Sequence, residues 1–111
     1  ALHFLKKGGA DPAAARQALM GGFADSKILN LHGERMIARN FVPGGLAEYQ
    51  LKDMRTAQTL AAKGGLHFTL LDCLVGMFGD MIDRFGTGHD VSGILQEVER
   101  RSGGDGAKAA S

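Results

Sequence analysis

The sequence predicts an all-α domain built from six or seven short to medium helices. No segment alternates apolar and polar residues with the period of two that marks a half-buried strand. Apolar residues instead recur every three or four positions along several segments. Glycine pairs and one Asp-Pro sequence separate these segments, as expected where helices end and begin. The sequence contains no internal repeat.

The composition describes one soluble globular domain. The 111 residues allow a modest core, with 44% hydrophobic and 23% charged residues. A net charge of +1 gives no basis for a nucleic-acid partner or a membrane partner. The most apolar window, residues 66–85, contains four charged side chains, so no transmembrane helix is expected. No signal-peptide pattern is present, and the single Cys73 fits a reducing compartment, so we expect a cytoplasmic protein.

The first helices are predicted from local signals. Residues 1–7 resemble the end of a helix already under way, and we therefore expect the sequence to be a piece of a longer protein. Asp11-Pro12 is a clear start signal, because aspartate caps free N–H groups and proline suits the first helical position. The next helix, from Lys27 to about Arg39, is expected to be capped by Asp25 or Ser26. Gly33 inside it costs about 1 kcal/mol relative to alanine, so a break into two shorter helices is compatible with the sequence.

The second half begins with a Pro-Gly-Gly turn at residues 43–45. This turn is expected to start the longest helix, residues 46–63. The following helix, residues 70–85, has a wide apolar face and is therefore expected to be central, with Thr69 as its cap. Its Gly76 and Gly79 predict close approach of another helix.

The end of the chain is predicted as one more helix followed by a tail. Asp90 is expected to cap the last helix, in which apolar residues recur at positions 91, 94, 95 and 98. From Ser102 onward the Gly/Ala/Ser-rich sequence predicts a flexible tail, residues 102–111. The helical domain is thus expected to span residues 1–101.

Most chemically active side chains have an ordinary structural interpretation. The four histidines are scattered without metal-ligand spacing, so the sequence predicts no metal site. Residues 86–90 do not match a dinucleotide-binding fingerprint and are interpreted as a helix end. Cys73 is expected to be an inert core thiol.

Lys52-Asp53 is the one charged pair that looks placed for chemistry. A lysine in the first two turns of a helix is disfavoured by the helix dipole. Asp53 shares a helical face with apolar neighbours, so we expect a partly buried carboxylate with Arg35 or Arg39 as its partner. Ordinary surface decoration is the alternative interpretation of the pair.

Four stretches form a recognisable series of motifs: residues 16–26 (R-Q-A-L-M-G-G-F-A-D-S), 31–37 (L-H-G-E-R-M-I), 41–44 (F-V-P-G) and 51–54 (L-K-D-M). Together they resemble the C-terminal domain of the β-hydroxyacid dehydrogenases, the 3-hydroxyisobutyrate dehydrogenase-like family. The resemblance covers roughly residues 1–101. Residues 16–37 are most similar to the members that reduce tartronate semialdehyde to glycerate. Gly45, where an aromatic residue is common, and the sequence L-H-F-T at 66–69 depart from the family pattern.

The resemblance implies a 6-phosphogluconate dehydrogenase C-terminal-domain-like fold and a role in an oxidoreductase that uses NAD or NADP. In such enzymes an N-terminal Rossmann domain, absent from this sequence, binds the cofactor, and the helical domain closes the cleft. Lys52 matches the family lysine that reaches the nicotinamide end of the cofactor. The catalytic lysine is expected upstream, so this chain alone should neither bind the cofactor nor turn over substrate.

The resemblance also implies partners and leaves alternatives open. The expected partners are the Rossmann domain, a small hydroxyacid or semialdehyde substrate and a second copy in a homo-oligomer. The first alternative substrate is 3-hydroxyisobutyrate or a related β-hydroxyacid. A second alternative is that the chain is a non-catalytic helical dimerisation module.

Overall fold

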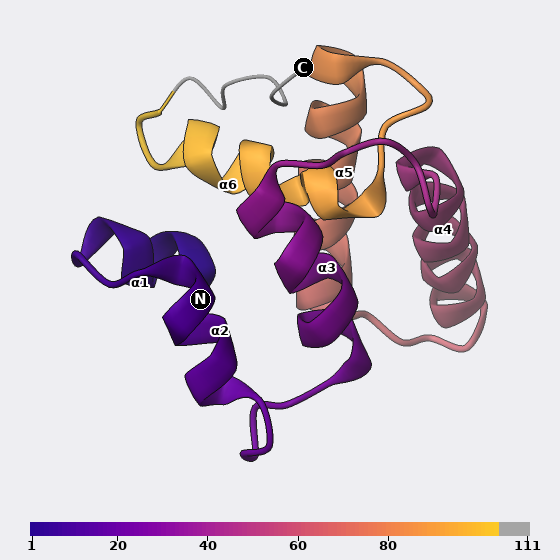
Figure 1. Cartoon of the computed structure of the whole chain (residues 1–111). Coiled ribbons are helices and arrows are strands. Elements are labelled where there is room, and N and C mark those ends of the chain that lie inside the picture. Colours follow the sequence, from indigo (N-terminus) through magenta and orange to yellow (C-terminus); the bar gives the residue numbers. More distant parts are fainter. Residues whose placement is uncertain (105–111) are drawn as a thin grey trace.

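The computed structural model describes residues 1–104, and this part of the chain is all helical (Figure 1). Its elements are α1 (Leu2–Lys7), α2 (Pro12–Leu19), α3 (Lys27–Ala38), α4 (Ala47–Lys63), α5 (Thr69–Phe85), the 3-10 turn η1 (Val91–Gly93) and α6 (Ile94–Arg101). Within residues 1–104 the β-type pairing is one isolated antiparallel bridge between Leu46 and Asp90. The all-α prediction is confirmed. No helix in this part of the chain is long and apolar enough to cross a membrane.

Local capping signals fix the first helix starts. The Asp11 carboxylate accepts from the Ala14 N–H at 2.9 Å and begins α2, as predicted. Ser26, rather than Asp25, caps α3 by accepting from the Leu29 N–H at 2.9 Å. Asp25 instead accepts from the Gly21 N–H at 2.8 Å and closes the loop before the helix.

The helix α3 is continuous through Gly33, so the break that the sequence allowed does not occur. Gly33 is buried, and a Cβ atom there would lie 3.2 Å from the Cδ of Arg16. The Arg16 guanidinium crosses this point and donates to the Asn30 carbonyl at 2.8 Å. The glycine therefore serves the close approach of α2 to α3, which offsets its low helix propensity.

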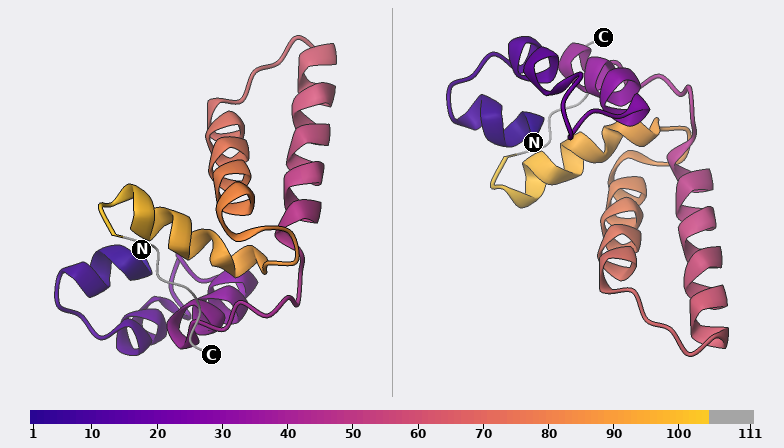
Figure 2. Two further views of the ribbon diagram at one scale, coloured as in Figure 1. Left: turned by 90° about the horizontal axis from the view of Figure 1, so that it is seen from above. Right: turned by 90° about the horizontal axis from the view of Figure 1, so that it is seen from below.

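The helices form a body and an arm. α4 and α5 lie side by side and project as a hairpin from the body formed by α1, α2, α3 and α6 (Figure 2). The buried core lies at the base of this arm, where α4 and α5 meet α6 and η1. Its buried members are Ala47, Leu51, Met54, Phe78 and Met81.

The expectation that α5 is the central helix is wrong. Only Phe78 and Met81 are buried in it, whereas Leu70 is 79% exposed. Cβ atoms at Gly76 and Gly79 would meet nothing within 4 Å, so the predicted close helix approach is also absent. The physical reason is that the outer half of α5 extends beyond the body and packs on α4 alone.

Two smaller predictions for α5 are also wrong. Cys73 is exposed rather than a core thiol, because it lies on the side of α5 opposite Leu71, Val75 and Phe78, which pack in the core. Thr69 is the first helical residue, not the cap; the cap position belongs to Phe68, which makes no side-chain capping bond.

The central element is instead η1 with α6. Ser92, Gln96 and Glu97 have no exposed surface, because η1 contacts α3 and α4, and α6 contacts α5 and α1. Asp90 caps η1 through the Ser92 N–H at 2.9 Å, and α6 follows directly from that turn. Residues 102–104 form a hydrogen-bonded turn at the end of α6. The rest of the predicted tail, residues 105–111, lies outside the described residues.

Candidate functional site

Lys52 lies on the outer face of α4, in the second turn of the helix. The helix buries Ala47, Leu51 and Met54 against the core. Residues on the opposite side of the helix therefore face solvent. The Lys52 side chain is 70% exposed, and its Nζ lies 3.0 Å from Oδ1 of Asp53.

The structure corrects the expected environment of Asp53. Its side chain is 68% exposed rather than partly buried, because it lies on the side of α4 away from the buried Leu51. The two expected arginine partners bind other carboxylates. Arg35 Nε lies 3.3 Å from Asp90, and Arg39 pairs with Glu99 at 2.8 Å.

The exposed pair leaves Lys52 available to a ligand. An ion pair between two solvent-exposed side chains contributes about 0–1 kcal/mol, so it gives way readily to a better partner. Tyr49 and Thr56 flank Lys52 on the same helical face, and the Thr56 hydroxyl donates to the Lys52 carbonyl at 3.0 Å. The face therefore offers one cation between polar side chains, a set suited to an amide or an anionic group.

The start of α4 is joined to the segment before η1 by backbone hydrogen bonds. The Ala47 N–H donates to the His89 carbonyl at 2.9 Å, and the Val91 N–H donates to the Gly45 carbonyl at 2.9 Å. The Gly88 N–H donates to the Glu48 carboxylate at 2.8 Å. These bonds position the first turn of α4, the helix that carries Lys52.

Asp90 is the buried charge at this junction, with no exposed surface. Its Oδ1 accepts from the Gly44 N–H at 2.8 Å and the Gly45 N–H at 3.1 Å. Its Oδ2 accepts from the Ser92 N–H at 2.9 Å and from the Ser92 hydroxyl. Burial by itself raises the pKa of Asp90, but the hydrogen bonds from Ser92 and the two glycine amides together hold it well below its usual range. The side chain is therefore a carboxylate.

Arg35 of α3 connects this carboxylate to the loop before α4. Its Nη2 donates to the Val42 carbonyl, and its Nε faces Asp90 without the alignment of a hydrogen bond. The sequence predicts only a capping role for Asp90 and does not indicate this cluster. The usable signal was the Pro-Gly-Gly turn, whose two glycine amides need buried acceptors.

Two hollows lie near these elements. A groove of 970 Å³ lies between α3, α4, α5 and η1, and its lining includes Arg35, Asp90, Leu74 and Phe78. Lys52 lies on the opposite side of α4 from the groove lining, which includes Met54. Within residues 1–104, no three His, Cys, Asp or Glu side chains are grouped to hold a metal ion.

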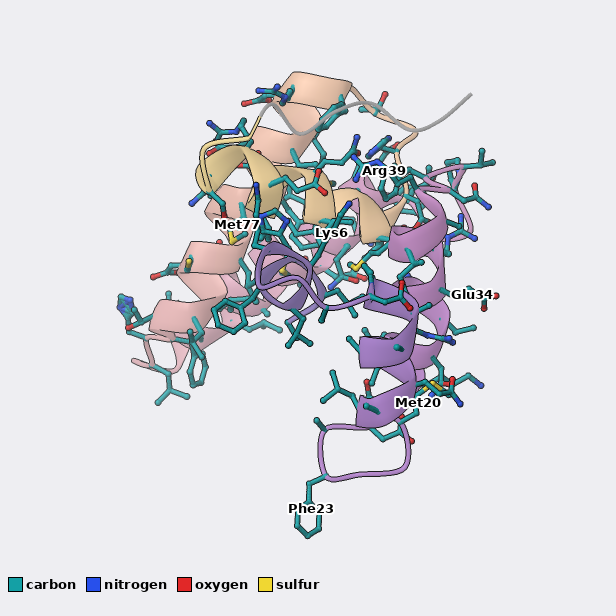
Figure 3. All side chains as sticks on the ribbon, turned by 60° about the vertical axis from the view of Figure 1, so that its left-hand side comes forward. Lys6, Met20, Phe23, Glu34, Arg39 and Met77 are labelled. Carbon is teal, nitrogen blue, oxygen red and sulfur yellow. The ribbon has the colours of Figure 1, made fainter. Side chains whose placement is uncertain are left out.

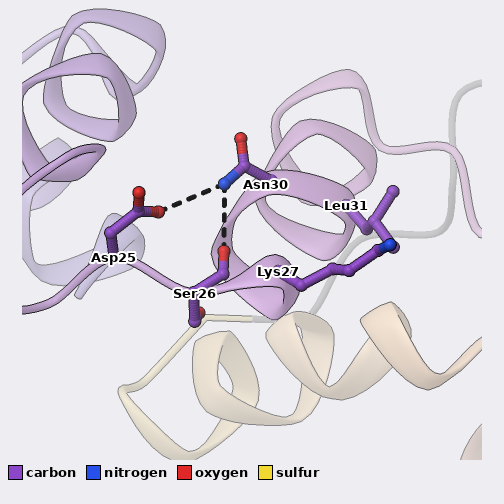
Figure 4. Close-up of a pocket in the computed structure, with 5 residues that line it drawn as sticks. All are labelled: Asp25, Ser26, Lys27, Asn30 and Leu31. Carbon is purple, nitrogen blue, oxygen red and sulfur yellow. Dashed lines mark hydrogen bonds between the residues drawn. The ribbon is translucent and has the colours of Figure 1, made fainter.

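A shallower hollow of 460 Å³ lies at the start of α3 (Figure 4). The Asn30 amide donates there to Asp25 at 3.1 Å and to the Ser26 carbonyl at 3.0 Å. These polar groups are already paired with each other, so they stabilise the loop between α2 and α3. Phe23 projects into solvent from the tip of this loop (Figure 3).

Comparison with known proteins identifies the family. Residues 1–98 match the family model described as "NAD-binding of NADP-dependent 3-hydroxyisobutyrate dehydrogenase". The chain belongs to the 3-hydroxyisobutyrate dehydrogenase family. The predicted resemblance is thereby confirmed, and the family is one that uses a nicotinamide dinucleotide.

Three curated relatives have informative names. The chain is 41% identical over 99 residues to the 2-hydroxy-3-oxopropionate reductase of Escherichia coli (strain K12), covering 89% of this chain and 34% of that protein. It is 38% identical over 58 residues to "Probable 3-hydroxyisobutyrate dehydrogenase-like 2, mitochondrial" of Arabidopsis thaliana, covering 52% and 19%. It is 28% identical over 100 residues to "Probable 3-hydroxyisobutyrate dehydrogenase-like 3, mitochondrial" of Arabidopsis thaliana, covering 90% of this chain and 30% of that protein. The chain thus spans about a third or less of these relatives.

The residues of this 3-hydroxyisobutyrate dehydrogenase family member fit a nicotinamide cofactor. The outer face of α4 combines the exposed ammonium of Lys52 with the exposed hydroxyl group of Tyr49, whereas the Thr56 hydroxyl already donates to the Lys52 carbonyl. A carboxamide or a phosphate accepts hydrogen bonds from such donors. The assignment of Lys52 as a cofactor ligand remains a prediction.

Proposed function

We propose that this chain is the helical domain of an NAD(P)-dependent oxidoreductase that reduces tartronate semialdehyde (2-hydroxy-3-oxopropionate) to glycerate. The observation that carries the proposal is the 41% identity, over 89% of the chain, to a protein named 2-hydroxy-3-oxopropionate reductase. The alternative substrate, 3-hydroxyisobutyrate, is supported by the names of the family model and of the plant relatives.

In this proposal, residues 1–101 form the helical domain, and an N-terminal Rossmann domain of the longer protein binds most of the dinucleotide. The helical domain closes the cleft and presents the outer face of α4 to the nicotinamide end. Lys52 donates from its ammonium to the cofactor and holds that end in place. This role agrees with an exposed Lys52 side chain that pairs with the adjacent and similarly exposed Asp53.

When bound, the reduced nicotinamide supplies the hydride that converts the aldehyde carbon to an alcohol carbon. The proton that reaches the substrate oxygen comes from a group outside this chain, since the family lysine for that step is expected upstream. The contribution of this chain is therefore to orient and enclose the reactants rather than to transfer the proton.

A substrate comparison tests the proposal. A polypeptide that joins this chain to its Rossmann domain is assayed with NADH and NADPH for reduction of tartronate semialdehyde. It is also assayed with the oxidised cofactors for oxidation of 3-hydroxyisobutyrate. We expect kcat/KM to be at least tenfold higher for tartronate semialdehyde than for 3-hydroxyisobutyrate. A difference of one small substituent in a binding pocket typically changes kcat/KM by about this factor or more. A preference for 3-hydroxyisobutyrate would establish the alternative, and no turnover of either would refute both.

A further inference from the structure

The start of α4 lacks a capping side chain of its own. Leu46 occupies the cap position and makes no side-chain hydrogen bond to the first turn. A helix end without a local cap needs other groups to fix its backbone. Here those groups come from a segment more than forty positions later in the chain, at Asp90 and its neighbours.

Asp90 and Arg35 hold the loop before α4 from two sides. Asp90 accepts from the amides of Gly44 and Gly45, and Arg35 donates to the carbonyl of Val42. The two side chains also face each other at 3.3 Å. The carboxylate of Asp90 therefore binds backbone N–H groups of this loop, and the guanidinium of Arg35 binds one of its carbonyl groups. The loop leads directly into Ala47, the first residue of α4.

We infer that Asp90 is a positioning residue for the cofactor-binding role of Lys52. Asp90 is fully buried, so it acts through α4 and not by touching the cofactor. The inference rests on the proposed function, because it needs Lys52 to be a cofactor ligand. The alternative is that the packing of α4 on α5 positions Lys52, and that Asp90 contributes only to the stability of the fold.

The expected size follows from helix geometry. Lys52 lies five residues after Ala47, about 7.5 Å along the axis of a helix with a rise of about 1.5 Å per residue. A tilt of about 10° at Ala47 would move the Cα of Lys52 by roughly 1 Å. A misplacement of about 1 Å can cost up to about a hundredfold in an oriented active site.

Asp90→Asn is the informative substitution. Its amide keeps one acceptor but places an NH2 group against either the glycine amides or Ser92, because the carboxylate accepts at both oxygens. Asp83→Asn makes the same change of charge at an exposed position of α5 and is the matched control. Should Asp90→Asn fail to fold, Ser92→Ala removes one hydroxyl bond to the same carboxylate and tests the same cluster more gently.

The first measurement is amide hydrogen exchange in this chain. We expect Asp90→Asn to speed exchange at Gly44, Gly45 and Ala47 by tenfold or more relative to distant α4 amides. Ser92→Ala should speed it by a smaller factor, and Asp83→Asn should leave it unchanged. A uniform change across all helices would assign Asp90 to global stability alone and overturn the inference.

The second measurement uses the polypeptide that carries the Rossmann domain, in a cycle with Lys52→Ala. We expect Asp90→Asn to raise the cofactor KM about tenfold, and the double variant to lose no more cofactor affinity than Lys52→Ala alone. A purely structural role would lower only the active fraction and the apparent kcat. The inference would be overturned if the double variant lost the cofactor affinity of both single variants added together. An unchanged cofactor KM in Asp90→Asn would also overturn it. If Lys52→Ala itself leaves the cofactor KM unchanged, the assignment of Lys52 fails, and the inference fails with it.

Discussion

Replacing Glu97 by glutamine should remove a large acid-sensitive part of the stability of this chain. Glu97 has no exposed surface and lies in α6, the central helix. It accepts from Arg100 at 2.6 and 2.9 Å and from Arg101 at 2.7 Å. The two hydrogen bonds from Arg100 and, to a smaller extent, the one from Arg101 lower the pKa of Glu97 from 4.5 to about 2, against the opposing effect of burial.

The pKa difference sets the size and the sign of the effect. The fall of the Glu97 pKa from 4.5 to about 2 corresponds to at most about 3 to 4 kcal/mol. Solvent screening at the partly exposed arginines reduces this to roughly 2 kcal/mol. Because the folded-state pKa is the lower one, this stabilisation is fully present above pH 4.5 and is lost as the pH falls toward about 2. Glu97→Gln should therefore unfold about 10 °C lower at pH 7. The difference from the unsubstituted chain should shrink by more than half at pH 3.

Thermal unfolding followed by circular dichroism at pH 7 and pH 3 measures this difference. Glu34→Gln is the matched control, since the Glu34 side chain is 75% exposed and lies 4.0 Å from Arg16. It should shift the melting temperature by less than about 2 °C at either pH. Asp90 titrates in both proteins, so its contribution cancels in the difference between them. If the difference in melting temperature between the unsubstituted protein and Glu97→Gln is the same at pH 7 and pH 3, the reasoning is refuted.

The remaining predictions concern function and association. Lys52→Ala should change the free energy of unfolding by less than about 0.5 kcal/mol in chemical denaturation, yet weaken cofactor binding ten- to a hundredfold in the longer protein. A large loss of stability with normal cofactor binding would make Lys52 structural. Asp53→Ala should also leave stability nearly unchanged, because its carboxylate is exposed; a loss above about 1 kcal/mol would show a partner in solution. The 111-residue chain alone should give no turnover of tartronate semialdehyde above a protein-free control with either reduced cofactor. It should self-associate through the exposed apolar side of α5, and sedimentation showing only monomer at high micromolar concentration would contradict this.

The helix starts and ends could be predicted from the sequence, because the interactions that fix them are made between residues close together in the chain. The Asp11-Pro12 start, the Ser26 cap and the glycine-rich ends act within one turn of backbone, and each lies where the sequence indicated. The family, too, could be predicted from short motifs, because those motifs lie in continuous stretches.

What the sequence did not predict depends on contacts between distant segments. Asp53 shares a helical face with apolar residues, but that face lies in solvent, since Leu60 on it is itself 63% exposed. Gln96 and Glu97 look like surface residues, yet α5 and α1 cover them from two sides. The Asp90 cluster joins three segments, and no spacing within any one of them indicates that they meet.

The projecting arm has a consequence for the heat capacity of the protein. In the folded monomer the outer half of α5 already holds Leu70, Leu74 and Cys73 in water. Unfolding therefore exposes less new apolar surface than it does in a compact domain of the same length. Calorimetry should give a heat-capacity change below the roughly 1.3–1.7 kcal/mol/K expected for 111 residues. The stability curve of the monomer should accordingly be flatter, so its stability varies less with temperature than that of a fully packed helical domain.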